Sequence, residues 1–384
     1  MREGWTYKKL GDVCESELGK TLNSAKDKGE LHPYLCAVNV LWDKIDISSL
    51  KETKFEDSEL ERYSVKQGDL LVCEGGDIGR AAIWDKDYPI LYQNALHRLR
   101  FSENILPRFC LMYLMNLKEK GDLDAKYGKG VTIKHLVKSS LLSIPIPVPP
   151  LSEQERIVSE LDLLSSIIEK KKAQLKEYDQ LAQSIFYDMF GDPVTNEKGW
   201  EIKKLEDIAS SKIGLTYKPT DVCDEGVIVL RSSNIQESHL DFKDVVRVKC
   251  SIKPHQWVQN GDILMCSRNG SFKLVGKVAM IENLTEQMSY GAFMTIIRSE
   301  YNHYLFSFFQ SPAFRNQLGC AGTATINQIT VKMLNDIHIP LPTFSLQQEF
   351  ADKISDIEAM KAKVRQSLKE AEQLFNSRMD YYFN

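Results

Sequence analysis

Two segments of the chain place apolar residues at alternating steps of four and three, which is the spacing of a coiled-coil seam. Seventeen of the twenty positions in these two seams are apolar. We therefore predict two long helices, over residues 151–190 and 343–384, that pair with each other through the seams. The seam positions are Ile157, Leu161, Leu164, Ile168, Lys171, Leu175, Tyr178, Ala182, Ile185 and Met189 in the first helix, and Phe350, Ile354, Ile357, Lys361, Val364, Leu368, Ala371, Phe375, Arg378 and Tyr382 in the second.

A similar junction precedes each predicted helix. The proline-punctuated apolar runs "IPIPVPP" and "IPLPTF" hold the chain extended, and they are followed by Ser152 and Ser345. Glu155 and Gln348 stand three residues after these serines. We therefore expect a capping box at the start of each helix.

The rest of the chain alternates short runs of both secondary-structure types. Runs typical of strands, such as "GVIVL" and "VGKVAMI", are separated by Gly, Asn and Asp, and helical runs such as "PRFCLMYLMNL" lie between them. This pattern predicts globules of the α/β or α+β class. We expect a first globule over residues 1–150, a linker over 191–198 and a second globule over 199–342.

Much of the sequence occurs twice. A shift of 195 residues places Gly4–Thr21 on Gly199–Thr216 with nine of eighteen positions identical, and a shift of 193 places Gly68 on Gly261. Two copies are too few for a solenoid. We therefore predict a pseudo-twofold molecule, in which two similar globules are joined by an antiparallel coiled coil about 50 Å long at 1.5 Å per residue.

Composition places the chain among ordinary globular proteins. Its 384 residues are 43% hydrophobic and 27% charged, with a formal net charge of −4. The cysteines form no C-x-x-C pair and the histidines do not fall at metal-ligand spacings, so we expect reduced thiols and no metal. No apolar run reaches the length of a membrane span, and "MREGWTYKKL" lacks the apolar stretch of a signal peptide. We therefore expect a cytoplasmic protein.

No motif in the chain assigns catalysis to it. A DNA methyltransferase that modifies a flipped base through its exocyclic amine needs an Asn-Pro-Pro-Tyr-type clamp, and this sequence has no Asn-Pro pair. The run "GKGVT" does not end in the G-K-[ST] of a phosphate-binding loop. We therefore predict a non-enzyme with no cofactor of its own.

The two junctions, the "GW-x-x-KKL-x-D" openings, the "GD[IL]L" runs and the globule–helix–globule–helix order resemble, over the whole length, the specificity subunit of a type I restriction-modification system. The resemblance implies that each globule is a target recognition domain that reads one half of a bipartite target in double-stranded DNA. It implies that the helices set the spacing of the halves and dock two methyltransferase subunits. It also implies motor-nuclease subunits, with S-adenosylmethionine, ATP and Mg expected only in the partner subunits.

Two other interpretations stay open at this point. The acidic balance favours a two-globule adaptor scaffold without DNA contact, and the lack of catalytic motifs is also compatible with the specificity part of a type IIB-like restriction enzyme. Neither globule is strongly basic overall. A DNA-binding face must therefore be a local patch, with much of the phosphate affinity supplied by partner subunits.

Candidate base-reading residues are the polar and cationic side chains of predicted loops. The run "CSRNGSFKLVGK" (Cys266–Lys277) is the strongest candidate loop, because it combines cations, glycines and an aromatic residue. Asn39 and Asn234 match between globules that should read different sequences, so we expect them in structural turns, as we do the Gly-Asp pairs at Gly68 and Gly261. The candidates are Lys26, Lys28, Arg80, Asn94, His97, Arg98, Lys129, Thr132 and Lys134 in the first globule, and Lys218, Arg231, Ser232, Arg268, Asn269, Lys273, Lys277, Asn327 and Gln328 in the second.

The predicted helices carry more apolar residues than their seams need. A second apolar face must be covered, either by the globules or by helices of a methyltransferase subunit. The sequence leaves both explanations open. The candidates for partner binding on this face are Leu163, Ile167, Leu181, Phe186, Phe190, Met360, Leu374 and Met379.

Overall fold

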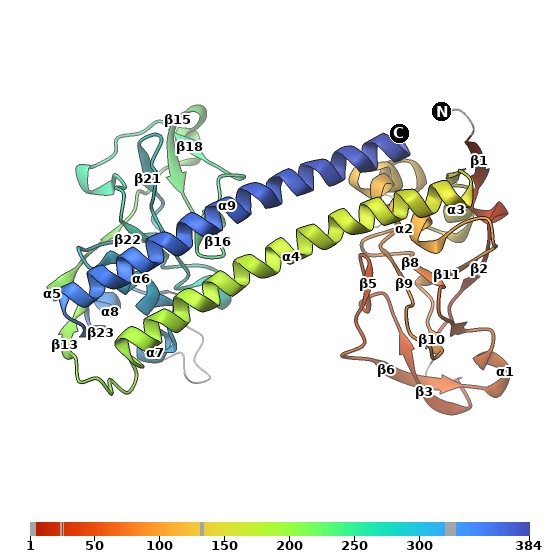
Figure 1. The fold of residues 1–384 in the computed structure, drawn as a ribbon, viewed down its shortest axis with the longest axis horizontal. Helices are drawn as coiled ribbons and strands as arrows, with labels where there is room; N and C mark the ends of the chain where they lie inside the picture. The colour runs from red at the N-terminus through yellow and green to blue at the C-terminus, as the bar shows by residue number, and fades with distance from the viewer. Residues whose placement is uncertain (1–4, 24, 26, 131–133, 319–327) are drawn as a thin grey trace. The chain divides into compact units, whose positions relative to one another are not determined.

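The fold is taken from a computed structural model (Figure 1), which describes residues 5–384 except 24, 26, 131–133 and 319–327. The chain divides into two compact units. Unit 1 comprises Met1–Lys172 and Gln366–Asn384, and unit 2 comprises Ala173–Arg365. The predicted five-part domain division stays a prediction, because these units divide the chain inside the two long helices. Among the described helices, none combines the length and the apolar character that crossing a membrane requires.

Unit 1 contains two four-stranded sheets, in the orders β2-β11-β8-β9 and β6-β3-β10-β7, a β1-β12 pair and a β4-β5 hairpin. Its strands are β1 (Thr6–Lys9), β2 (Cys14–Leu18), β3 (Glu30–Leu35), β4 (Val40–Leu41), β5 (Lys44–Ile45), β6 (Lys51–Phe55), β7 (Ser64–Val65), β8 (Leu70–Cys73), β9 (Ala81–Ile83), β10 (Ile90–Tyr92), β11 (Leu96–Phe101) and β12 (Pro145–Val148). Its helices are α1 (Asp57–Leu60), α2 (Pro107–Glu119), α3 (Lys138–Leu142), the first part of α4 (Leu151–Phe190) and the last part of α9 (Phe344–Phe383).

Unit 2 has corresponding sheets in the orders β14-β22-β19-β20 and β18-β15-β21, a β13-β23 pair and a β16-β17 hairpin. Its strands are β13 (Glu201–Lys204), β14 (Ser210–Ile213), β15 (Val222–Leu230), β16 (Ile235–Gln236), β17 (His239–Leu240), β18 (Arg247–Val248), β19 (Ile263–Cys266), β20 (Val278–Met280), β21 (Met288–Tyr290), β22 (Met294–Arg298) and β23 (His338–Leu341). Its helices are α5 (Leu205–Ile208), α6 (Asn302–Gln310), α7 (Pro312–Gln317), α8 (Val331–Asn335) and part of α9 (Phe344–Phe383).

The two units share one topology. In each, one strand pair is parallel (β10 with β3, β21 with β15), and the four-stranded sheet around β8 or β19 is antiparallel. The strand that opens each globule pairs with the strand that leads into the long helix, β1 with β12 and β13 with β23. The structure therefore confirms the predicted mixed class and the predicted duplication.

The central strand of each unit explains how its core is arranged. Side chains of a strand alternate between the two faces of a sheet. In β19, Ile263 and Met265 pack toward α4, α6 and α9, whereas Leu264 and Cys266 pack toward the second sheet. Strand β8 divides its four buried residues between helices and second sheet in the same way. Each unit is thus a three-layer arrangement of helix, sheet and sheet, and both faces of its central sheet are buried.

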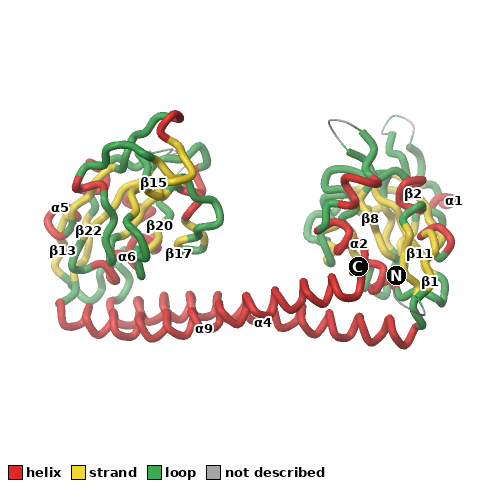
Figure 2. Tube along the Cα trace, turned by 90° about the horizontal axis from the view of Figure 1, so that it is seen from above, coloured by secondary structure: helices red, strands yellow, loops and turns green. Residues whose placement is uncertain are grey.

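The segments of α4 and α9 run antiparallel in each unit (Figures 1 and 2). In unit 1, Arg156 donates to the hydroxyl of Tyr382 at 3.1 Å and Glu160 pairs with Arg378 at 2.6 Å, so rising numbers in α4 meet falling numbers in α9. None of the twenty predicted seam residues is exposed. The structure therefore confirms the antiparallel coiled coil and its register of apolar positions.

The long helices start within one residue of the predicted positions, but the predicted capping boxes are not formed. The helices begin at Leu151 and Phe344, so the two serines lie inside the first turn rather than at the cap. Glutamines two residues further on fasten the junction instead. Gln154 Nε2 donates to the carbonyl of Pro149 at 2.9 Å, and Gln347 Nε2 donates to that of Pro342 at 2.8 Å. The prolines position these carbonyls because they keep the entry extended.

Candidate nucleic-acid interface

A buried turn fixes one end of the central strand in each unit. Gly68 and Gly261 both have φ of +88°, which glycine adopts without strain. The carboxylate of Asp262, next in the chain, accepts from the backbone N–H of Gln259 at 2.8 Å and from Arg298 at 2.6 and 2.7 Å. Asp69 makes the matching contacts with Lys66 and Arg100. The structure confirms these Gly-Asp pairs as turns, and they leave the opposite end of each strand to present a loop.

The matching asparagines also have structural roles. Asn234 Oδ1 accepts from the N–H of Arg231 at 2.9 Å, and its Nδ2 donates to the carbonyls of Asp241 and Asp244, both at 2.9 Å. Asn39 closes the equivalent turn of unit 1 by accepting from Cys36 and donating to Asp46. Both are buried, as expected of turn residues that carry no sequence information.

In unit 2, three candidate segments meet at the end of β19. Asn269 Nδ2 donates to Ser232 Oγ at 3.0 Å, and Arg268 forms an isolated β-bridge with Gln328. The backbone N–H of Ile329 donates to the carbonyl of Ser267 at 2.7 Å. We call Ser232, Arg268, Asn269 and Gln328 the unit 2 loop cluster; these contacts give its loops a defined relative position.

An aromatic residue that sequence reasoning missed belongs beside this cluster. Phe293 precedes β22 and is 59% exposed, although it is large and apolar. The guanidinium of Arg268 lies over its ring, 5.4 Å from the centroid. An exposed ring next to an arginine offers a stacking or wedge surface in addition to hydrogen bonds. Its position in a turn between two apolar strands could have identified it from the sequence, because a turn residue is not needed in the core.

The other unit 2 candidates divide by exposure. Lys218 and Lys273 are exposed, and Arg231 is ion-paired with Asp244 at 2.8 Å. Lys277 is half-buried and its ammonium donates to the carbonyl of Ile235, so it fastens the loop from within. Burial lowers the pKa of Lys277. Its present contact thus positions the loop, and base reading by Lys277 stays a prediction. Asn327 lies outside the described residues.

Unit 1 holds its equivalent loops with the same backbone contact. The N–H of Leu136 donates to the carbonyl of Glu74 at 2.7 Å, beside an isolated bridge between Lys129 and His135. Lys129 is exposed, and so is Lys134, whose ammonium donates to the carbonyl of Asp124 at 2.6 Å. Thr132, between them in sequence, lies outside the described residues.

Two candidates of unit 1 are corrected by the structure. His97 is fully buried in β11, where its Nε2 is 2.9 Å from the carbonyl oxygen of Leu136. Burial also lowers the pKa of His97, which favours the neutral imidazole. Arg98 is buried, and its Nη1 donates to the carbonyl of Ser64 at 2.6 Å. Neither side chain reaches the surface, because their strand lies inside the sheet.

Three further unit 1 candidates are described. Arg80 is half-buried and donates to the carbonyl of Ala37 at 2.6 Å, while Asn94 donates to Thr21 Oγ1 at 3.1 Å. Lys28 is exposed, and Lys26 lies outside the described residues. The candidates of unit 1 thus lie on several loops and include fewer exposed cations than the sequence had suggested.

Two buried cysteines of the central strands have perturbed thiols. Burial raises the pKa of the Cys73 and Cys266 thiols, which disfavours the nucleophilic thiolate. No group of three or more His, Cys, Asp or Glu side chains in the described ranges is placed to hold a metal ion.

The partner-binding candidates on the helices fall into two groups. Phe186, Phe190 and Met379 are buried in the cores of this chain, and Phe186 packs against Tyr304 with ring centroids 5.5 Å apart. These three are therefore removed from the partner-binding set, because the globules already cover them. The remaining candidates, which stay predictions, are Leu163, Leu181, Met360 and Leu374, all exposed, and the half-buried Ile167.

Comparison with known families shows which family has this architecture. The family model described as the type I restriction modification DNA specificity domain matches the chain twice, over residues 2–177 and 197–373. The chain belongs to this family. The two matches correspond to the two copies of the repeat, so the specificity-domain family accounts for nearly the whole sequence.

Individual relatives agree with the family assignment. The type I restriction enzyme MjaVIII specificity subunit of Methanocaldococcus jannaschii is 22% identical over 393 residues, which cover 96% of this chain and 90% of the relative. The S subunit of a type I restriction-modification system from M. genitalium, a crystal structure, has a TM-score of 0.54 at 15% identity, covering 98% of this chain and 95% of that one. A chain from a structural study of assembly and conformational transition in a type I R-M system has a TM-score of 0.58 at 19% identity, covering 100% and 98%.

Proposed function

We propose that this protein is the sequence-specific DNA-recognition subunit of a type I restriction-modification complex, and that each unit reads one half of a bipartite target. The observation that carries the proposal is the duplicated specificity domain. Each copy presents polar loops at the end of its central strand opposite the Gly-Asp turn. In unit 2 these loops combine Arg268 with an amide, a hydroxyl and an exposed aromatic ring. Such groups can bind base edges and stack on bases.

The proposal assigns the chemistry to partner subunits. Methyltransferase subunits would bind S-adenosylmethionine and methylate the DNA, and motor-nuclease subunits would use ATP and Mg to restrict it. This chain would be non-catalytic and would hold no cofactor. Its net charge of −4 supports a division of labour in which partners supply much of the phosphate attraction.

The proposal also gives the helices two tasks. They would set the number of unread base pairs between the half-sites, and their exposed apolar residues Leu163, Leu181, Met360 and Leu374 would dock the methyltransferase subunits. Exposed apolar side chains on a coiled coil are costly unless a partner covers them. The paired seams provide the stiffness that a spacer needs.

Methylome sequencing of cells that carry this chain with its methyltransferase tests the proposal. We expect methylation at one bipartite sequence. In Arg268→Ala or Lys273→Ala we expect binding by the methyltransferase complex to weaken by about 1–3 kcal/mol, with relaxed discrimination in one half-site only. Lys203→Ala is the control, because this half-buried lysine lies in the β13-β23 pair, away from the candidate loops.

Three outcomes would contradict the proposal or part of it. Methylation without sequence preference would favour an adaptor scaffold. A uniform loss of affinity for unrelated DNA would assign Arg268 and Lys273 to phosphate contacts. Relaxation of both half-sites would show that the two units do not read separately.

A further inference from the structure

The unit 2 loop cluster contains one cation that the described parts of the chain leave available. Arg268 is exposed, and its guanidinium lies over the ring of Phe293, 5.4 Å from the centroid. No carboxylate, carbonyl or hydroxyl of the described residues pairs with this guanidinium. A guanidinium that packs on an aromatic face keeps the donors in its own plane free for another partner.

The aromatic residue of this pair is held in place through its backbone. The carbonyl of Phe293 accepts from the N–H of Ser267 at 2.9 Å and from the N–H of Arg268 at 3.0 Å. Its side chain is 59% exposed and belongs to none of the apolar cores of unit 2. The ring therefore has a fixed position at the end of β19, although the fold does not need an apolar residue there.

Unit 1 keeps this backbone arrangement without the two side chains. The N–H of Glu74 donates to the carbonyl of Ala95 at 2.9 Å. Ala95 thus takes the place of Phe293, and Gly75, which follows Glu74, takes the place of Arg268. The scaffold is shared and the presented side chains differ, as expected of two sites that recognise different sequences.

The loop that carries Arg268 is also longer than its counterpart. In both units a glycine N–H donates to the carbonyl of the last residue of the central strand, Gly276 to Cys266 at 2.7 Å and Gly79 to Cys73 at 3.0 Å. Nine residues lie between the members of the first pair and five between those of the second. Unit 2 therefore has more chain at this end of its central strand with which to contact a ligand.

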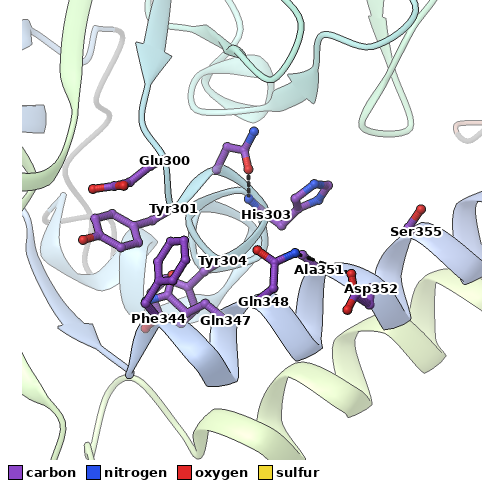
Figure 3. A pocket seen from close by; sticks show the side chains of 11 residues that line it. Glu300, Tyr301, His303, Tyr304, Phe344, Gln347, Gln348, Ala351, Asp352 and Ser355 are labelled. Atoms are coloured by element: carbon purple, nitrogen blue, oxygen red, sulfur yellow. Dashed lines mark hydrogen bonds between the residues drawn. The ribbon is translucent and has the colours of Figure 1, made fainter.

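The opposite end of β19 is unsuited to DNA. A pocket of about 250 Å³ lies there between the starts of α6 and α9 (Figure 3), where Asn302 Nδ2 donates to the carbonyl of Gly261 in the turn at 3.1 Å. Glu300 and Asp352 in the lining of this pocket are exposed. Their carboxylates repel phosphate groups. The loop cluster is therefore the end of β19 that suits a nucleic acid.

The geometry of the Arg268–Phe293 pair limits which bases it can contact. Arginine pairs most often with O6 and N7 of guanine in the major groove. A G·C pair carries no methyl group, so an apolar ring beside that arginine finds an apolar partner in the C5-methyl of a thymine in a neighbouring pair. The 5.4 Å between guanidinium and ring centroid is more than one base-pair rise of about 3.4 Å and less than two. The ring thus matches the adjacent pair.

Insertion of the ring between two base pairs does not fit this arrangement. A wedge residue enters a base step and separates the two stacked bases. One face of the Phe293 ring is covered by the Arg268 guanidinium. The other face and the ring edge can contact a methyl group, but bases cannot enclose the ring on both sides.

We propose that Arg268 and Phe293 together read a guanine and an adjacent thymine in the half-site of unit 2. The guanidinium donates to O6 and N7 of the guanine, and the ring packs on the C5-methyl of the thymine. The half-site of unit 1 is read without such a pair, because Gly75 and Ala95 stand in its place. The inference rests on the proposed function and names two neighbouring base pairs of the target.

Deoxyuridine tests the methyl contact, because it pairs as thymidine does and lacks only the C5-methyl. The complex of this chain with its methyltransferase is titrated with duplexes that contain the target found by methylome sequencing. The half-site that relaxes in Arg268→Ala is assigned to unit 2. Replacing the thymine beside its guanine by deoxyuridine should weaken binding about fourfold, as expected for one buried methyl group. In Phe293→Ala the two duplexes should bind equally.

Two further variants separate the ring contact from other effects. Phe344→Ala is the matched control, because Phe344 is 55% exposed but lines the pocket at the opposite end of β19 (Figure 3). It should keep the fourfold preference for thymine. Phe293→Leu should retain a preference for thymine, since leucine still offers an apolar surface to the methyl group.

Several results would overturn the inference while the proposed function stands. A unit 2 half-site without a G·C pair next to an A·T pair would exclude this mode of reading, and so would a half-site pair that Arg268→Ala leaves unchanged. Equal binding of both duplexes by the wild-type complex would show that the methyl group is not contacted. A fourfold preference that persists in Phe293→Ala would assign the methyl contact to another residue. Methylation without sequence preference would instead contradict the proposed function itself.

Discussion

Units 1 and 2 share a scaffold but fasten their hairpins to the long helices by different means. In unit 1, Arg108 of α2 joins Asp43 of the β4-β5 hairpin to Asp162 of α4, with 2.6 Å between Arg108 Nη2 and Asp162 Oδ1. In unit 2 the corresponding residues are Ser238, His303 and Ser355. Burial lowers the pKa of His303, which favours its neutral form. The ionic clamp of unit 1 has therefore been replaced.

Unit 2 instead places one lysine inside the helix pair. Lys361 occupies a seam position, is 3% exposed, and pairs with Asp179 of α4 at 2.6 Å and with Glu358 at 2.7 Å. Glu358 in turn meets His239 of the β16-β17 hairpin at 3.3 Å. A buried lysine can select register, because a different register would leave its charge without a carboxylate partner. The comparison shows that duplication preserved the sheets and turns, whereas the junctions to the helices diverged.

The largest expected effect concerns what the units share. Replacing the buried Asp262 by Ala removes the acceptor of Arg298 and of a backbone N–H, and should lower the free energy of unfolding of unit 2 by about 3–5 kcal/mol. Asp69→Ala should cost unit 1 a similar amount, because Arg100 is paired in the same way. Native-state hydrogen exchange on β19 and β8 measures each unit separately. If the two variants lower the free energy of unfolding of their units by clearly different amounts, the two turns are not equivalent.

The next effect should differ between the units. Gln154→Leu removes three hydrogen bonds and leaves Leu106 N–H and two carbonyls without a partner, so unit 1 should lose about 2–3 kcal/mol. Gln347→Leu removes one hydrogen bond together with an acceptor that already lacks a partner, and should cost about 1 kcal/mol or less. Urea titration with exchange detection at α2 and α6 compares them. Equal losses would show that Gln347 is satisfied in solution, for example by ordered water.

A last effect is a pH dependence of unit 2 that adds to that of unit 1. Burial acts to raise the pKa of Glu358, but hydrogen bonds from His239 and Lys361 outweigh it and lower this pKa from 4.5 to about 2. Because the folded pKa lies below the unfolded one, the stabilisation is complete above pH 4.5 and is lost as the pH falls toward 2.

The measurement is the stability of unit 2 by hydrogen exchange across that pH range. As the pH falls, unit 2 should lose more free energy of unfolding than unit 1. Glu358→Gln should reduce this difference between the units. If the variant keeps the full difference, another carboxylate is responsible.

Features of this protein that depend on local pattern could be predicted from the residues alone. The steps of four and three specified the seam, because an α-helix brings those positions to one face whatever surrounds it. The two Gly-Asp runs specified turns, since glycine accepts a positive φ and the aspartate can accept backbone N–H groups nearby in the chain. The duplication predicted two globules of one topology, and the asparagines repeated at Asn39 and Asn234 were correctly assigned to turns.

Which polar side chains reach the surface depends on contacts between segments remote in sequence. His97 and Arg98 have the composition of base-reading residues, but their strand is buried by a second sheet that is remote in sequence. Phe186, Phe190 and Met379 had the composition of a partner surface, and the globules cover them. The serine cap was wrong because the two serines lie inside the first turn of each helix. The loop before α6 is two residues shorter than the loop before α2. Which hydrogen bonds such a loop makes with a long helix that is remote in sequence can be seen only when the fold brings the loop and the helix together.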